Sequence, residues 1–105
     1  MAFKAVFIAH APDADPARDH SVIETGKYKL FTTLVRSQAQ ALEGCRKLVQ
    51  DKGIHSVVLC PGFTHRDIAE IADAVGKNVG VTVARGDGPS SRVTAEVFRK
   101  EGWSS

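Results

Sequence analysis

The sequence predicts an α/β fold: a single-domain, three-layer α/β/α sandwich of the flavodoxin or Rossmann-like type, around a four-stranded, mostly parallel sheet. Three observations lead to this prediction. Short apolar runs alternate with amphipathic helical patterns over the C-terminal two thirds of the chain. The first run, Phe3 to Ala9, is apolar at nearly every position, which is typical of a strand buried on both faces. The length of 105 residues is that of one domain, so residues 1–105 are expected to fold as a unit.

The N-terminal third is predicted to contain two strands separated by a long loop. Phe3 to Ala9 forms the first strand, and its apolar character places it centrally. Residues 10–20 contain two prolines and three aspartates without periodicity, and are expected to form a loop in which His20 is solvated. Within residues 22–35, the second strand is best placed at Lys29 to Val35, after a turn at Glu24 to Gly26.

A capped helix and a third strand come next. Residues 37–40 (Ser-Gln-Ala-Gln) match a capping box, in which the serine oxygen accepts a backbone N–H and the glutamine reaches back. The amphipathic pattern that follows ends at Gly53, a residue suited to helix termination. Ile54 to Cys60 is the third strand.

The last third repeats this pattern of a capped helix followed by a strand. Residues 64–67 (Thr-His-Arg-Asp) are a second capping-box candidate, and Gly76 ends the helix that they begin. Asn78 to Ala84 is the fourth strand. Pro89 opens a third helix, after which Trp103 is expected to pack back on the body.

The resulting order is strand–strand–helix–strand–helix–strand–helix. Helical crossovers link the last three strands, which should therefore be parallel with right-handed connections. Strands that are apolar on both faces need cover on both faces, which implies three layers. Three helices cover four strands thinly, so either the loop of residues 10–26 or a partner subunit is expected to complete the cover. The protein is predicted to be a homo-oligomer for that reason.

Composition argues against several function classes. The net charge is +2, and the 14 lysines and arginines are scattered among 12 acidic residues without the basic cluster of a nucleic-acid-binding face. No apolar stretch approaches the ~20 residues of a membrane helix, and no signal peptide is evident at the N-terminus. A cytoplasmic location is therefore expected, with Cys45 and Cys60 as reduced thiols.

Polar residues follow three of the predicted strands where each strand ends. If the first strand is parallel to the others, all three loops lie at one edge of the sheet, where α/β proteins bind ligands. His55 begins its strand, roughly 17 Å from that edge, and is excluded. The candidate residues are His10 and Asp13 in the first loop; Cys60, Gly62, Thr64 and His65 in the second; and Arg85, Gly86, Asp87, Gly88, Ser90 and Ser91 in the third.

Anion binding is the leading interpretation of these loops. The second and third loops each enter a helix N-terminus, where unpaired N–H groups favour a phosphate or carboxylate. His10 and Asp13 would form the opposing wall of the site. Turn geometry and helix capping alone account equally for the glycines and serines, and the chain has neither a dinucleotide fingerprint nor a phosphate loop. The predicted ligand is a small anionic metabolite, and no cofactor is specified.

Nucleophilic catalysis by Cys60 is the alternative. A thiol near a helix N-terminus loses its proton more readily, and His65 or His10 can act as the base in acyl or thiol transfer. Cysteine is also common in cores, and Cys60 shares its strand face with Ile54 and Val58. No close pair of metal ligands appears, so no metal site is assigned. A non-catalytic oligomerisation or interaction module is the third interpretation.

Five segments together resemble an uncharacterised family of small bacterial proteins, a domain of unknown function. They are residues 10–16 (HAPDADP), 23–25 (IET), 60–65 (CPGFTH), 87–90 (DGPS) and 102–103 (GW). The resemblance spans nearly the whole chain, and the segment 60–65 is its most specific part. It implies a free-standing domain and carries over no catalytic role.

Overall fold

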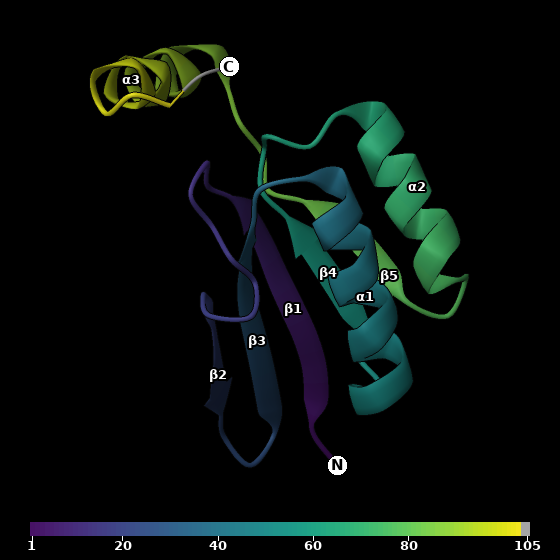
Figure 1. The fold of residues 1–105 in the computed structure, drawn as a ribbon. Helices are drawn as coiled ribbons and strands as arrows, with labels where there is room; N and C mark the ends of the chain where they lie inside the picture. Colours follow the sequence, from purple (N-terminus) through teal and green to yellow (C-terminus); the bar gives the residue numbers. More distant parts are fainter. Residues whose placement is uncertain (104–105) are drawn as a thin grey trace.

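A computed structural model describes residues 1–103 of the chain (Figure 1). Within this range the fold is α/β, with five strands and three helices. In chain order the elements are β1 (Phe3–His10), β2 (His20–Glu24), β3 (Tyr28–Val35), α1 (Gln38–Lys52), β4 (Ser56–Leu59), α2 (His65–Val75), β5 (Gly80–Val83) and α3 (Gly88–Lys100).

The sheet is mixed, with strand order β2-β3-β1-β4-β5. β1 pairs in parallel with both β3 and β4, and β4 pairs in parallel with β5, as predicted for the strands linked by helices. β2 is antiparallel to β3 and forms one edge. The prediction of four strands is wrong on this point, because His20–Glu24 was assigned to a loop and a turn. All five of its residues are exposed, so no buried apolar face marks the segment as a strand.

The two capped helices begin and end close to the predicted positions. The Ser37 side chain accepts from Gln40 N–H, although the Gln40 side chain reaches Arg36 N–H rather than completing the predicted capping box. α1 ends at Gly53, which adopts φ 64°, in the left-handed region where glycine is favoured. At α2 both bonds of the box form between Thr64 and Asp67.

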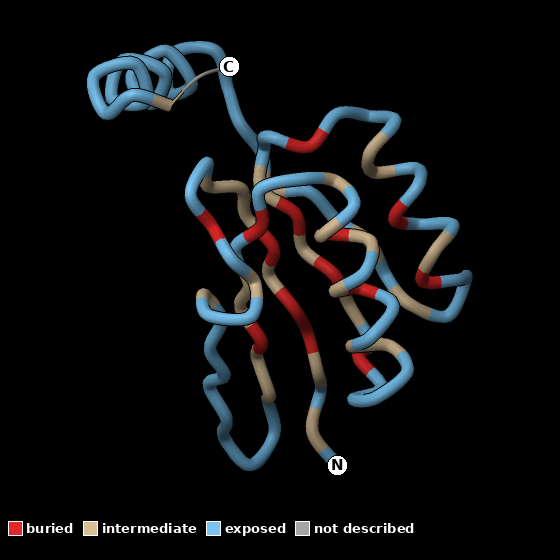
Figure 2. Tube along the Cα trace, in the orientation of Figure 1, coloured by how far each residue is buried: buried red, intermediate tan, exposed pale blue. Residues whose placement is uncertain are grey.

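The core lies between the sheet and the helix pair α1 and α2, which pack side by side on one face (Figures 1 and 2). Val6 and Ile8 of β1 and Val57 and Leu59 of β4 are almost fully buried there, together with Ile71 of α2. These side chains alternate along the strands, so they all point to the same face of the sheet.

The predicted third layer is absent from residues 1–103. α3 lies beyond the carboxyl ends of the strands, clear of the sheet, and has no buried residue (Figure 1). Trp103 does not pack back on the body, because it stacks on Phe98 of α3 with ring centroids 4.2 Å apart. The second face of the sheet therefore has no helix over it within the described chain.

Candidate functional site

The predicted convergence of three loops on one edge follows from the direction of β1. Because β1, β3, β4 and β5 are parallel, the loops after β1, β4 and β5 all leave the same edge of the sheet. β1 is flanked by β3 on one side and by β4 on the other, so the chain winds outward in both directions from β1. The crevice at such a switch point is where open α/β sheets bind ligands.

Cys60 and His10 meet at this switch point. His10 ends β1, and Cys60 directly follows β4, where its backbone N–H donates to the Ile8 carbonyl at 3.0 Å. The Cys60 Sγ lies 3.6 Å from the His10 Nδ1, within hydrogen-bond range for sulfur. The His10 ring packs against Phe63, with ring centroids 4.2 Å apart. The thiol and the imidazole are both half-buried, so each remains within reach of a small molecule.

Gly62 permits this close approach. A Cβ placed on Gly62 would lie 3.1 Å from the His10 Nδ1 and 3.5 Å from the Cys60 Sγ. The first distance is tighter than ordinary packing, so a side chain at this position would press on the imidazole. Glycine at residue 62 therefore leaves room for the His10 ring, and no unusual backbone angle is involved.

The electrostatic setting of His10 favours a neutral imidazole. Burial lowers the pKa of His10 below its usual value, and the nearby Asp67 carboxylate opposes this shift only in part. A neutral imidazole with an available nitrogen can accept the thiol proton of Cys60. Of the two histidines proposed as the base, His10 is the one beside the thiol, whereas His65 is the exposed first residue of α2.

The two helix N-termini at this edge are already capped by acidic residues. At α2 the Thr64 side chain accepts from Asp67 N–H at 3.1 Å, and the Asp67 carboxylate accepts from Thr64 N–H at 3.0 Å. At α3 the Asp87 carboxylate accepts from Ser90 N–H at 2.9 Å. Hydrogen bonding from Ser90 lowers the pKa of Asp87. These carboxylates occupy positions that a bound anion would otherwise take, so the geometry favours the capping interpretation of Thr64, Asp87 and Ser90.

The loop after β5 lies against the loop after β4. A Cβ placed on Gly86 would lie 3.3 Å from the Ser91 Oγ and 3.5 Å from the Pro61 Cβ. Gly86 and Ser91 are thus neighbours of the segment that carries Cys60. Arg85 and Gly88 are exposed on either side of this contact, and the Arg85 side chain forms no hydrogen bond or ion pair with any other described residue.

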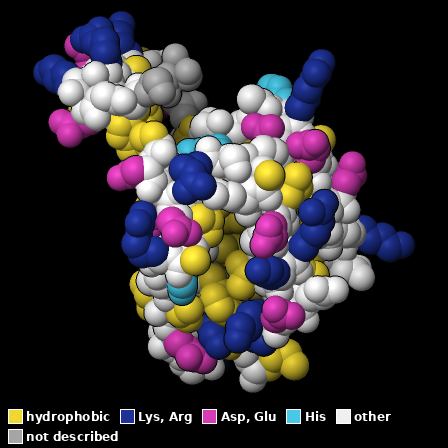
Figure 3. Space-filling model, viewed as in Figure 1, with side chains coloured by type: hydrophobic (Ala, Val, Ile, Leu, Met, Phe, Trp, Pro, Cys, Tyr) yellow, Lys and Arg dark blue, Asp and Glu magenta, His cyan; other side chains and the backbone are white. Residues whose placement is uncertain are grey.

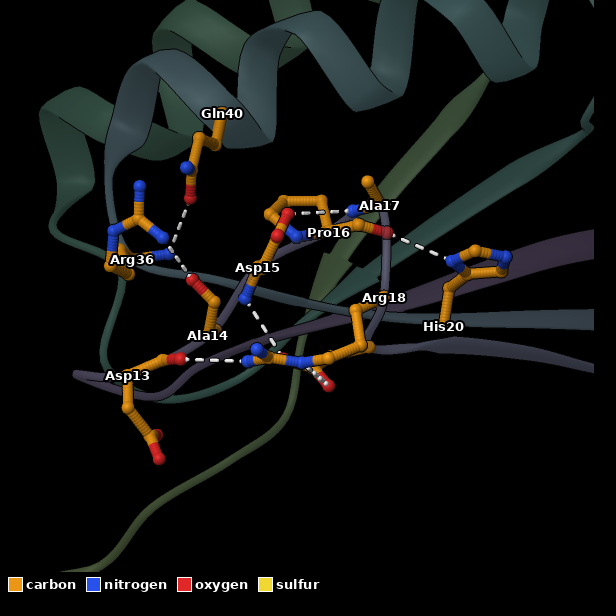
Figure 4. Close-up of polar contacts among 10 residues, drawn as sticks. Asp13, Ala14, Asp15, Pro16, Ala17, Arg18, His20, Arg36 and Gln40 are labelled. Atoms are coloured by element: carbon orange, nitrogen blue, oxygen red, sulfur yellow. Dashed lines mark hydrogen bonds and ion pairs between the residues drawn. The ribbon is translucent and has the colours of Figure 1, made fainter.

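The loop after β1 is held together by its own polar groups (Figure 4). Arg18 forms an ion pair with Asp19 at 2.8 Å, and Asp15 accepts from Ala17 N–H. Arg36 donates to the Ala14 carbonyl. The Asp13 carboxylate points away from the other side chains drawn in Figure 4 and has no hydrogen-bond or ion-pair partner in residues 1–103. Among the described residues, no hydrogen bond or ion pair joins Asp13 to Cys60 or His10.

A groove away from this edge was not predicted. It measures about 450 Å³ and lies between α1 and the β2–β3 edge, with Phe31, Val22 and Leu48 among its apolar lining and His20 at its margin (Figure 3). His20 is not a free loop residue, because its Nδ1 bonds to the Pro16 carbonyl at 2.8 Å. The groove escaped the sequence analysis because one of its walls is β2. The β-branched pair Val22-Ile23 was the available signal of this strand.

Two further observations concern metals and membranes. Within residues 1–103, no three His, Cys, Asp or Glu side chains gather in a way that would hold a metal ion. None of the helices described here combines the length and the apolar character needed to cross a membrane.

Comparison with known proteins gives one match. A family model described as "Family of unknown function (DUF6506)" matches residues 3–99. No curated protein and no solved structure matches the chain. The matched range includes all five strands and the three loops at the carboxyl edge. The expected membership of a family of unknown function is confirmed.

Proposed function

The chain belongs to the family of unknown function DUF6506, and on that premise we propose that it binds a small molecule at the carboxyl edge of its sheet, where Cys60 acts as a nucleophile with His10 as its base. The observation that carries the proposal is the 3.6 Å separation of the Cys60 Sγ and the His10 Nδ1. A nucleophile and a base within hydrogen-bond reach of each other are the usual signature of covalent catalysis.

Three further features support a reactive pair over a core cysteine. The pair lies at the β1/β4 switch point, the usual ligand position in such sheets. Gly62 has no Cβ, which would lie only 3.1 Å from the His10 Nδ1 and press on the imidazole. Cys45 provides the contrast, because it is fully buried and burial raises its pKa to about 11, as expected of an inert core thiol.

The chemistry that fits is transfer of an acyl group. The neutral His10 Nδ1 takes the thiol proton while the Cys60 Sγ bonds to the carbonyl carbon of the donor. The imidazolium then returns that proton to the departing group, which leaves a thioester on Cys60. An acceptor, either water or a second substrate, attacks the thioester and carries the acyl group away. The Cys60 thiolate regains a proton from His10, which has taken one from the acceptor.

Alkylation kinetics test the pair directly. Native protein is treated with iodoacetamide across a pH series, and modified Cys60 is quantified by mass spectrometry. We expect His10→Gln to slow alkylation of Cys60 at neutral pH by about tenfold or more, because the thiol then has no base within hydrogen-bond reach.

The controls separate a local effect from loss of the fold. Cys45 should remain unmodified in every folded variant because it is fully buried. His20→Gln removes an imidazole from β2, away from the pair, and should leave the Cys60 profile unchanged. Identical profiles for the native protein and His10→Gln would rule out a base role for His10.

An anionic ligand is the second candidate, and the contact between the two loops favours it. Gly86 packs against Pro61, so Ser91 and the exposed Arg85 border the same edge as Cys60. Arginine supplies the charge-assisted bonds that hold phosphate or carboxylate groups. The acidic caps at Asp67 and Asp87 oppose this role, which leaves Arg85 as its main support.

Thermal-shift measurements with phosphorylated and carboxylated metabolites test anion binding, because a ligand of the native state raises the melting temperature. A shift that Arg85→Gln abolishes would support the anionic ligand. If no metabolite in a broad panel shifts the melting temperature, anion binding is overturned. The Cys60–His10 pair is tested separately, by the alkylation profile.

A further inference from the structure

One face of the sheet is apolar and has no cover within the described chain. Alternate strand residues point to opposite faces, so the neighbours of the core residues point to the open side. In the five strands these open-side positions include no charged residue. They are Phe3, Ala5, Phe7 and Ala9 of β1; Ser21 and Ile23 of β2; Tyr28, Leu30, Thr32 and Leu34 of β3; Ser56 and Val58 of β4; and Gly80 and Thr82 of β5.

The exposure of the large residues on this open face is considerable. Phe3 is 45% exposed, Tyr28 43%, Leu34 39% and Ile23 61%. A sheet face that meets water normally carries polar side chains, and parallel sheets are normally covered on both faces. Apolar patches of this extent on a folded protein mark contact surfaces. The open face therefore has the composition of a face that another element covers.

The helix α3 has an exposed apolar side that could cover such a face. Val93, Val97 and Phe98 lie along one side of it and are 66%, 53% and 39% exposed. Arg92 and Arg99 lie on the opposite side, at the helical spacing of an amphipathic helix. In Figure 3 the hydrophobic side chains gather on one side of α3 and the Lys and Arg side chains on the other. Such a stripe is usually buried against a sheet or another helix.

We propose that α3 of a second copy of this chain covers the open face, in a reciprocal two-fold dimer. Each copy then supplies the third layer of its partner. The apolar side of α3 and the open face become buried together, while Arg92 and Arg99 stay in solvent. Because the two contacts are identical, the arrangement closes on itself and exposes no further copy of either surface.

The departure of α3 from its own sheet supports exchange between copies. Ala84 N–H donates to the Leu59 carbonyl at 2.7 Å, and Gly86 packs on Pro61, so the chain is held at the carboxyl edge up to the start of α3. From that edge α3 lies beyond the carboxyl ends of the strands rather than over the sheet of its own chain (Figure 1).

The area available is sufficient for a stable dimer. The 13 residues of α3 form a helix about 20 Å long and about 10 Å wide. Two such helices, each seated on a partner's sheet, would remove on the order of 1,200–1,600 Å² of surface from water, which is the range of standard stable interfaces. Seating only one helix would bury about half of that.

The first test is the mass of the native protein in solution, by light scattering or sedimentation at about 100 µM, a concentration well above the dissociation constant of a standard interface. We expect a particle of twice the 11.3 kDa of one chain. Val97→Asp places a carboxylate in the apolar side of α3 and should yield monomer. Ala95→Asp, two residues away and on the opposite side, is the matched control and should remain dimeric. A monomeric native protein overturns the proposal, and so does a dimer that Val97→Asp leaves intact.

The second test distinguishes exchange between copies from α3 folding back on its own sheet. Ile23→Asp places a charge on the open face at an exposed edge-strand position that the fold tolerates, and it should also yield monomer. An equimolar mixture of the Val97→Asp and Ile23→Asp chains can form one intact contact, from a native helix to a native sheet. Because this single contact buries about half the area, we expect a weaker dimer to reappear in the mixture as the concentration is raised, and in neither variant alone. If mixing restores no dimer, reciprocal exchange is overturned.

Discussion

At the scale of single residues, the decisive contact joins two positions that are 50 apart in the chain. Cys60 and His10 each occupy the last position of a parallel strand or the first after it, and the pairing of β1 with β4 brings them within 3.6 Å. Burial keeps His10 neutral, and Phe63 fixes one face of its ring. The second cysteine, Cys45, lies in the core between α1 and the sheet. The two thiols therefore have different surroundings although the sequence shows both as isolated cysteines.

Gly62→Ala should disturb the thiol–imidazole pair more than the fold. The added Cβ would lie 3.1 Å from the His10 Nδ1, so the imidazole must shift by a few tenths of an ångström. We expect slower alkylation of Cys60 at neutral pH and a change in the free energy of unfolding of no more than about 1 kcal/mol. Gly44→Ala is the matched control, because its Cβ meets nothing within 4 Å. An unchanged alkylation rate in Gly62→Ala would contradict the close packing.

The lowered pKa of Asp19 predicts that the stability of the protein falls in acid. The hydrogen bond from Arg18, followed by that from Asp15 N–H, lowers the pKa of Asp19 to about 2. The unfolded chain has a value of about 3.9, so the unfolded state binds the proton more readily as pH falls. The stabilisation is complete above pH ~4 and is lost as the pH falls toward 2.

Carboxyl-carbon NMR titration checks this value. The Asp19 resonance should titrate near pH 2. In Arg18→Ala it should move upward but stay below ~3.9, because Asp15 N–H still donates to the carboxylate. A native titration near 3.9 would contradict the Arg18–Asp19 geometry.

At the scale of elements, the residues at a helix start can either cap the helix or bind a ligand, and sequence patterns do not distinguish these two roles. Thr64 and Asp67 form a complete capping box at α2, and Asp87 caps α3. Each cap satisfies backbone N–H groups that would otherwise be available to a ligand. The segments that enter these helices therefore have a structural explanation, and the reactive candidate is the Cys60–His10 pair that precedes α2.

Thr64→Ala should destabilise the protein without changing the reactivity of Cys60. Loss of an N-cap side chain costs about 1 kcal/mol, within a range of about 0.5–2 kcal/mol. Denaturant unfolding measures this difference, and Thr64→Ser, which keeps the hydroxyl, should recover most of it. A lower alkylation rate of Cys60 in Thr64→Ala, with stability unchanged, would instead assign Thr64 to the site.

At the scale of the whole molecule, the described fold has a one-sided core. The buried side chains lie between the sheet and the pair α1 and α2, and the other face is apolar but open. The α/β prediction is correct, whereas the three-layer prediction fails because α3 leaves the sheet. If α3 exchanges between copies, the three layers predicted from the sequence form across two chains.

Leu59→Ala tests how much of the stability resides in the one-sided core. Leu59 is fully buried in β4 between the sheet and the helices. Removing its side chain should cost about 2–5 kcal/mol, a large part of the ~5–15 kcal/mol that holds a domain folded. Chemical denaturation measures the loss. Val93→Ala, at a position 66% exposed on α3, serves as the comparison and should affect the unfolding of the body much less.

The sequence by itself determined the features that local interactions control. The ends of α1 and α2 follow from Ser37, Gly53, Thr64 and Gly76, because capping and left-handed termination involve residues only a few positions apart. The parallel arrangement of the strands joined by helices follows from the crossover rule. The edge that carries Cys60 could therefore be located in advance.

Only the tertiary structure decided the remaining features. β2 is a strand because it pairs with β3, and its exposed residues leave no periodic signal of that pairing. His10 rather than His65 lies beside Cys60 because the register of β1 against β4 sets the distance, and register is a long-range property. The open face depends on where a four-residue connection sends α3. In each case the outcome rests on contacts between distant segments, which residue type and spacing do not specify.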